Sequence, residues 1–88
     1  MNIDIQSAEF IQCLERGEQD AFQRVFEMYH KPLCFFATRI VRDDSEAEDI
    51  VQEVFEKIWK KNTRIDEGES IDSYLFVAVR NACFTFLK

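Results

Sequence analysis

The apolar residues between positions 19 and 42 recur at helical spacing, and this pattern constrains the fold more than any other feature of the chain. Their intervals of 4, 3, 4, 3 and 4 residues place them on one continuous face of an α-helix. This stripe consists of Phe22, Phe26, Tyr29, Leu33, Phe36 and Ile40. The pattern predicts a helix over about 19–42 with one face against a core. Pro32 interrupts the stripe, so we expect a kink near Met28 to Tyr29.

Two more predicted helices are marked by capping residues. One is expected to run from about Ser7, a residue type that favours the N-cap, to Gly17, a residue type that often ends helices. The other begins at Ser45-Glu46-Ala47-Glu48, which matches a capping box, and continues to about Lys61.

A last helix is predicted to begin near Ser70, and it is still periodic at Lys88. No Gly, Pro or polar run closes it, so we expect the chain to be the N-terminal part of a longer protein. Phe76, Arg80 and Phe84 are expected to point away from the core, although Phe76 and Phe84 could instead pack beneath the first helix. The predicted core face of this helix contains Ile71, Leu75, Ala78, Ala82 and Phe86.

The composition agrees with a small helical domain. The chain has 88 residues, of which 47% are hydrophobic, and nine of them are Phe. It contains only two Gly and one Pro, which favours helices joined by short turns. We therefore expect an all-α fold with one domain over residues 1–88, a compact bundle of about four helices.

The cysteines and the N-terminus indicate the compartment. Cys13, Cys34 and Cys83 form no C-x-x-C pair and are expected to be free thiols in a reducing environment. The first residues lack the features of a signal peptide, and no apolar run approaches the ~20 residues of a membrane span. We expect a cytoplasmic protein with no membrane insertion.

The charge is distributed unevenly along the chain. The net charge is −6, and the segment 43–56 contains seven acids and no base. The segment 73–88 contains two bases, Arg80 and Lys88, and no acid. The acidic segment suits a basic protein partner, whereas only the last segment suits a phosphate backbone. A chain this acidic is not expected to hold duplex DNA alone at physiological salt.

The predicted helix from about 45 to 61 has two distinct faces. Its apolar face contains Ala47, Ile50, Val51, Val54 and Ile58, and Asp49, Gln52 and Glu56 lie opposite. Trp59 falls beside these polar residues. Two interpretations of Trp59 stay open, namely an interface anchor or a ring folded over the edge of the core.

Three motifs then resemble one known family. The run from Ala47 to Trp59 is similar to the AEDxVQExFxxxW signature of extracytoplasmic-function (ECF) sigma factors of bacterial RNA polymerase. The earlier run 17–22, with Tyr29, resembles the G-D-x-x-AF…Y pattern of that family, and the segment 73–81 resembles its WL-[YF]…IARN segment with Tyr74 in the Trp position. The matches cover about 14–88, which corresponds to region 2 of the family. Thr85 and Lys88 stand where the family often has Asp and Arg, and the second domain of the family, a helix-turn-helix, is absent.

The resemblance implies a transcription initiation factor that docks on the β′ coiled coil of core RNA polymerase and melts the promoter −10 element. The loop 63–72 and the last helix would capture the non-template strand, and an anti-sigma factor would be a further partner. The polymerase-binding residues implied are Asp49, Gln52, Glu53, Phe55, Glu56 and Trp59. The DNA-binding residues implied are Arg64, Tyr74, Val77, Arg80, Asn81, Phe84 and Lys88.

Other function classes find less support in the residues. His30 is the only histidine, and no nucleophile–base pair, phosphate loop or metal-ligand spacing occurs, so we expect no catalytic residue, cofactor or metal. The acids of the segment 43–49 lack EF-hand spacing and are explained by the dipole at a helix N-terminus. The alternative that stays open is an acidic helical module that binds a basic protein helix and has no role at DNA.

Overall fold

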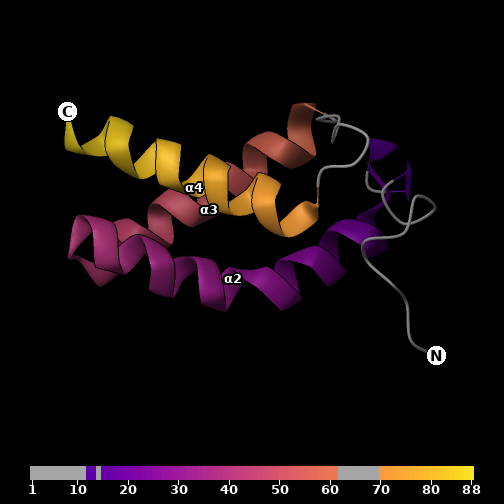
Figure 1. Ribbon diagram of the computed structural model, residues 1–88. Coiled ribbons are helices and arrows are strands. Elements are labelled where there is room, and N and C mark those ends of the chain that lie inside the picture. The colour runs from indigo at the N-terminus through magenta and orange to yellow at the C-terminus, as the bar shows by residue number, and fades with distance from the viewer. Residues whose placement is uncertain (1–11, 14, 62–69) are drawn as a thin grey trace.

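The computed structural model describes residues 12, 13, 15–61 and 70–88, and within them the chain is all-α. Three helices follow one another, α2 (Gln19–Val41), α3 (Asp44–Lys61) and α4 (Ile71–Leu87). They lie side by side with alternating direction, with α2 along one side of the pair formed by α3 and α4 (Figure 1). No described helix combines the length and the apolar character needed to cross a membrane.

The described end of the first predicted helix agrees with a stop at Gly17. Gly17 has a positive φ of 78°, and the backbone N–H of Glu18 donates to the carbonyl of Cys13 at 3.1 Å. This is the six-to-one hydrogen bond of a Schellman motif, which uses a left-handed residue to end a helix. Most of the segment 7–17 lies outside the described residues, so the fourth helix is not confirmed.

Helix α2 continues through Pro32, and the kink expected near Met28 is not confirmed. The proline leaves the carbonyl of Met28 without its usual helical partner. Because Pro32 and Met28 are both exposed, water can satisfy that carbonyl. The helix ends at Arg42, whose left-handed backbone lets its N–H donate to the carbonyl of Thr38 at 2.7 Å.

Helix α3 begins before the predicted capping box. The carboxylate of Asp43 accepts a hydrogen bond from the backbone N–H of Glu46 at 3.0 Å, and its carbonyl accepts from the N–H of Ala47. Asp43 therefore caps the helix, and the prediction that Ser45 starts it is wrong by two residues. Aspartate caps a helix as well as serine does, which explains why Asp43 can take this role two residues earlier.

Helix α4 begins as predicted, but its core face is different. Ser70 caps the helix by accepting from the N–H of Ser73 at 3.1 Å. Phe86 is 48% exposed, so its assignment to the core face is wrong, whereas Ala78 and Ala82 are half-buried and pack against the core. The buried residues are Ile71, Leu75, Val79 and Cys83. The helix carries apolar residues on most of its circumference, and periodicity alone cannot select one face of such a helix.

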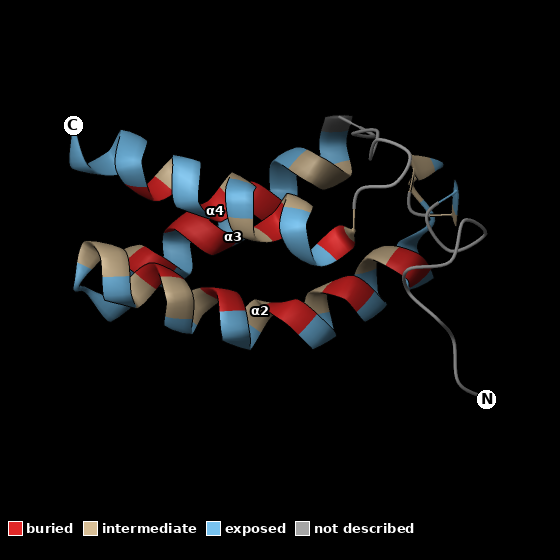
Figure 2. Cartoon of the chain, viewed as in Figure 1, coloured by how far each residue is buried: buried red, intermediate tan, exposed pale blue. Residues whose placement is uncertain are grey.

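The core lies between the three helices, whose buried faces point inward (Figure 2). No described polar or charged residue is buried. The hydroxyl of Tyr29 in α2 donates to the carboxylate of Asp72, which ties α2 to the first turn of α4. The buried residues of α2 and α3 are Ala21, Val25, Tyr29, Leu33, Ala37, Ala47, Ile50, Val51, Val54 and Phe55.

Candidate functional site

The outward face of α3 is polar and acidic. Asp49 and Gln52 are followed at helical spacing by Glu56, and Glu53 lies beside them. All four side chains are exposed, and we call this set the acidic surface. Within it, Glu53 forms an exposed ion pair with Lys57 at 3.7 Å, a type of pair that adds little stability. The remaining acids are free to meet a basic partner.

Trp59 lies at one edge of the acidic surface and is half-buried. Its ring centroid is 4.7 Å from that of Phe22 in α2, with a 52° angle between the planes. The contact supports the interpretation that this ring covers the edge of the core. Part of the ring is still accessible, so the same side chain can also contact a partner.

Phe55 does not belong to the acidic surface. It is 1% exposed, and its ring meets those of Phe22 and Phe26 at centroid distances of 6.0 and 5.1 Å. The resemblance placed it among the polymerase contacts because it belongs to the motif. In this fold it supports α3 from within, so we exclude it from the docking surface.

The outward face of α4 carries most of the expected DNA-binding residues on one stripe. Arg80, Asn81 and Lys88 are exposed, Val77 is 42% exposed, and Phe84 is 50% exposed. These five residues, at helical spacing, are the α4 stripe. No acid lies between Ser73 and Lys88, so the stripe combines two cations, an amide and accessible apolar groups.

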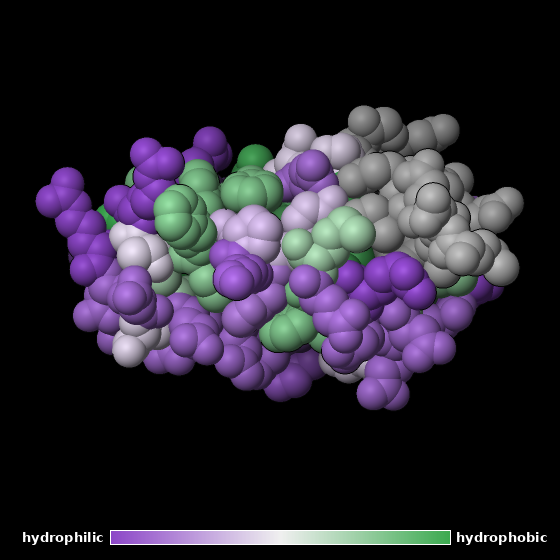
Figure 3. All heavy atoms as spheres, turned by 90° about the horizontal axis from the view of Figure 1, so that it is seen from below, coloured by the Kyte–Doolittle hydropathy of each residue, from purple (hydrophilic) through white to green (hydrophobic). Residues whose placement is uncertain are grey.

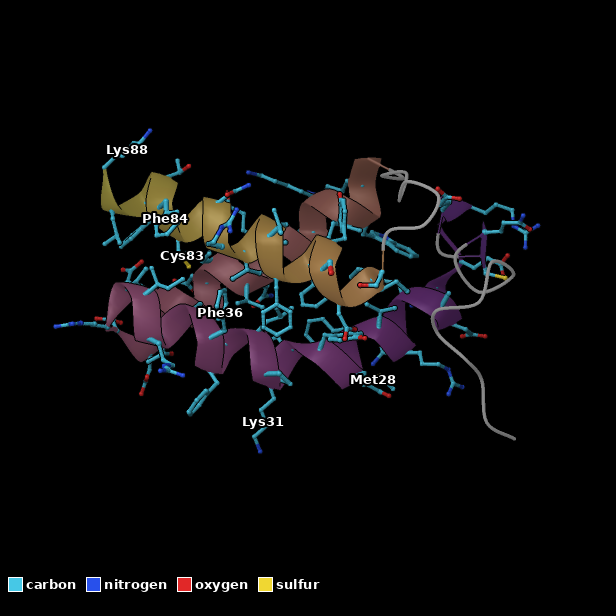
Figure 4. All side chains as sticks on the ribbon, in the orientation of Figure 1. Met28, Lys31, Phe36, Cys83, Phe84 and Lys88 are labelled. Carbon is cyan, nitrogen blue, oxygen red and sulfur yellow. The ribbon has the colours of Figure 1, made fainter. Side chains whose placement is uncertain are left out.

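Two other aromatic residues of α4 face inward in part. Tyr74 is half-buried and lines a small apolar pocket with Phe22 and Phe55. Phe76 meets Phe36 of α2 edge to face at 5.1 Å, so it packs on α2, and the alternative contact with the first predicted helix lies outside the described residues. Of the two phenylalanines left open by the sequence, Phe84 is therefore the one that reaches solvent. Figure 4 shows Lys88 pointing outward from the same end of α4.

Part of the expected DNA-binding segment lies outside the described residues. This holds for Arg64 and for residues 63–69 of the expected strand-capturing loop. The described end of that loop is Ser70, the cap of α4, followed by Asp72, which accepts the hydrogen bond from Tyr29.

The sequence interpretation missed a basic stripe on α2. Its residues are all exposed and lie on the side of the helix that faces away from the core. Helical spacing of the bases within 24–42 is the signal that could have revealed it, although the apolar stripe of the same segment is the stronger pattern. The α2 outer face consists of Arg24, Met28, Lys31, Phe35, Arg39 and Arg42.

The described residues offer little for catalysis. They contain no group of three or more His, Cys, Asp or Glu that could hold a metal ion. Burial raises the pKa of the Cys83 thiol, and burial together with the negative charge of Glu48 raises the pKa of the Cys34 thiol. Since the thiolate is the reactive form, both thiols are poor nucleophiles at neutral pH. His30 stacks on Phe26 at a centroid distance of 4.5 Å.

Comparisons with known proteins agree with this arrangement of surfaces. A search of curated proteins and a search of solved structures found no match. The model of the family described as sigma-70 region 2 matches residues 25–88, which include most of α2 and all of α3 and α4. Domains of this family are non-enzymatic transcription initiation domains that bind RNA polymerase and recognise the promoter −10 element. Because the match covers well over half of the chain, this protein belongs to the sigma-70 region 2 family.

Proposed function

We propose that the chain is the region 2 domain of an ECF-type sigma factor of the bacterial cytoplasm, and that its two outward faces have separate tasks. The acidic surface of α3 docks on the β′ coiled coil of core RNA polymerase. The α4 stripe, with Tyr74, Arg64 and the loop before α4, holds the non-template strand of the opened −10 element. The observation that carries this proposal is the family match over 25–88.

The acidic surface has the chemistry that docking on a basic partner requires. Three carboxylates and one amide are exposed on one face of a helix whose other face is anchored in the core by Val51 and Val54. A rigid helix presents such groups without a large ordering cost on binding. Trp59 adds an aromatic ring at the edge, and partly accessible Trp residues are common anchors of interfaces.

The α4 stripe has the chemistry that a single strand requires. Base stacking needs accessible π-faces, and Phe84 offers one. Asn81 offers two donors and one acceptor for a base edge, and Arg80 and Lys88 can follow the phosphate backbone. The side-chain amide of Asn81 is exposed and forms no hydrogen bond with a described residue, so it is available to DNA.

The ECF assignment rests on the motif from Ala47 to Trp59. Most of its charged and amide positions fall on the acidic surface, and its apolar positions fall in the core. An anti-sigma factor that binds the same surface would block docking and is part of the proposal.

The docking half of the proposal is tested by the affinity of a fluorescently labelled chain for core RNA polymerase. Gln52→Ala should weaken binding about tenfold, which corresponds to ~1.4 kcal/mol. Gln23→Ala is the matched control, because Gln23 is exposed on α2 and bonds only Glu27 of its own helix. Equal affinity of both variants and the wild type would refute docking through the acidic surface. The module without a DNA role predicts the same loss for Gln52→Ala, so this test must be paired with one at DNA.

The DNA half is tested by the chemical reactivity of unpaired thymines on a promoter that the wild-type complex opens. Asn81→Ala should strongly reduce opening when polymerase is saturated with the chain. Because Asn81 is exposed within a helix, this substitution should leave stability unchanged or raise it by about 0.5 kcal/mol. Wild-type opening by Asn81→Ala would remove this residue from the strand contact. Wild-type opening by a variant with Arg80, Asn81 and Phe84 all changed to Ala would favour the module without a DNA role.

A further inference from the structure

The outer face of α2 has no task in the proposed function. Arg24 and Lys31 lie seven residues apart, which returns them to the same side of the helix, and Arg42 follows as the C-cap of α2. Met28, Phe35 and Arg39 fall within the same sector. Lys31 and Met28 project from the side of α2 that faces away from α3 and α4 (Figure 4).

This face carries more positive than negative charge. Four cations lie on it, whereas the exposed acids on the same side of α2 are Asp20 and Glu27, near its N-terminal half. The excess of cations stands out in a chain whose net charge is −6. The ion pairs between described residues, Arg16 with Glu18 and Lys57 with Glu53, involve none of the four cations. The face therefore carries a net positive charge whose cations form no ion pair with a described carboxylate, and an acidic partner would be attracted to it, most strongly from Lys31 to Arg42.

The apolar side chains of this face decide which acidic partner fits. Met28 is 52% exposed and Phe35 is 71% exposed, although each could have been a polar residue at no cost to the core. They lie seven residues apart, or about 10.5 Å along the helix. A phosphate backbone would use the cations and leave both side chains in water. A protein helix with carboxylates around an apolar stripe would use all six residues.

The surface itself has the mixed character that such a partner needs. Figure 3 looks onto the molecule from the side of α2, and hydrophobic atoms there form small islands among hydrophilic ones. Met, Phe and Arg are all enriched at protein interfaces relative to the rest of the surface.

We propose that the outer face of α2 is a docking surface for an acidic amphipathic helix of a protein partner. Apolar side chains of that helix, spaced by seven residues, cover Met28 and Phe35. Its carboxylates meet Arg24, Lys31, Arg39 and Arg42 on both sides of the apolar contact. This surface shares no residue with the acidic surface or the α4 stripe, so it can be occupied while the domain is bound to polymerase or DNA.

The test uses a defined probe, a fluorescein-labelled helical peptide of about 18 residues with Leu on one face and Glu on its flanks. Fluorescence anisotropy with the 88-residue chain at ~150 mM salt should give a dissociation constant of about 10–100 µM, as expected for a small charge-assisted interface. Two further peptides replace either the Leu residues by Ser or the Glu residues by Lys, and both should bind at least tenfold more weakly.

Matched variants place the binding on α2. Phe35→Ser and Arg39→Glu should each weaken the Leu–Glu peptide at least fivefold. Both side chains are exposed, so Phe35→Ser should keep the thermal stability of the wild type, and Arg39→Glu should lower it only slightly through the dipole at the end of α2. Phe84→Ser and Arg80→Glu make the same chemical changes on α4 and should leave the affinity unchanged.

Three results would overturn the proposal. The first is no binding of the Leu–Glu peptide up to ~1 mM. The second is an equal loss for the α4 variants, which would show that the peptide binds elsewhere. The third is tighter binding of a duplex DNA of equal charge that is indifferent to Phe35→Ser, which would make the face a phosphate-binding surface. Because core polymerase is absent from these measurements, they can fail while the proposed function holds.

Discussion

The outward faces of α3 and α4 differ in how completely each helix divides polar from apolar residues. On α3 the exposed positions are polar, and the five apolar residues from Ala47 to Phe55 are at most 7% exposed. On α4 the apolar residues continue onto the solvent side, where Val77, Phe84 and Leu87 are each more than 40% exposed. Two helices of nearly equal length in one small domain thus present opposite chemistry to solvent.

The difference shows how a helix can serve a core and a partner together. On α3 the apolar side chains are buried in the core, and the side chains that a partner can contact are charged or carry amides. On α4 apolar groups are left accessible, which is unfavourable in water unless a ligand covers them. A protein surface is suited to the first face, and unstacked bases are suited to the second.

The largest expected effect on stability comes from a buried residue of α3 that lies beneath the acidic surface. Phe55→Ala removes a ring that is 1% exposed and in contact with the rings of Phe22, Phe26 and His30, so it should cost about 3–5 kcal/mol. That loss approaches the whole stability of a small domain. Urea unfolding followed by circular dichroism measures it. A Phe55→Ala chain with wild-type stability would return Phe55 to the docking surface.

A second effect tests which side of α4 faces the core. Val79 is 0% exposed and Val77 is 42% exposed, so the two residues differ only in their position on the helix. Val79→Ala should cost about 2 kcal/mol through lost burial and a cavity, whereas Val77→Ala should cost less than ~0.5 kcal/mol. Thermal melts of the two variants decide the question, and equal losses would contradict the described core face.

A smaller effect on stability is expected for Trp59, which packs on the edge of the core and also lies at the edge of the acidic surface. Trp59→Ala should cost about 1–2 kcal/mol, below the 3–5 of a fully buried Trp, because only part of the ring packs on Phe22. It should also weaken polymerase binding after correction for the folded fraction. Wild-type stability would leave Trp59 as a surface anchor alone, and wild-type affinity would leave it as a core residue alone.

The smallest effect is the pH dependence contributed by Cys83 in α4. Since burial raises its folded-state pKa, the unfolded chain gives up the thiol proton first as pH rises. This contribution to stability is fully present below the ordinary thiol pKa of ~8.5 and is lost as pH rises through the folded-state pKa. The loss of stability between neutral and alkaline pH should be smaller in Cys83→Ala than in the wild type. An identical loss in both would show that the thiol is not desolvated.

These contrasts also explain what the sequence could predict. The apolar face of α3 follows from its residues because polar groups occupy the opposite side, and Gly17 and Ser70 mark helix boundaries that the structure confirms. For α4 the face could not be predicted, since the sequence does not say which of Val79 and Phe86 a neighbouring helix covers. The same limit applied to Phe55. Its position in the motif does not show whether the side chain contacts the polymerase or is buried and supports the residues that do.

Only part of the candidate site could be predicted, for a related reason. The family motif identified residues that lie together on α3 and α4, while their exposure depended on the packing of α2. The α2 outer face was overlooked because its cations carry no motif, although their spacing was present in the sequence.

Promoter opening at fixed polymerase, titrated with the chain, tests most directly whether the two faces have separate tasks. Gln52→Ala on α3 should shift the midpoint of the titration about tenfold and reach the wild-type plateau, because it weakens docking alone. Asn81→Ala on α4 should keep the wild-type midpoint and lower the plateau, because it impairs strand capture alone. If both variants change the same parameter, or if each changes the parameter expected of the other, the division of tasks between α3 and α4 is wrong.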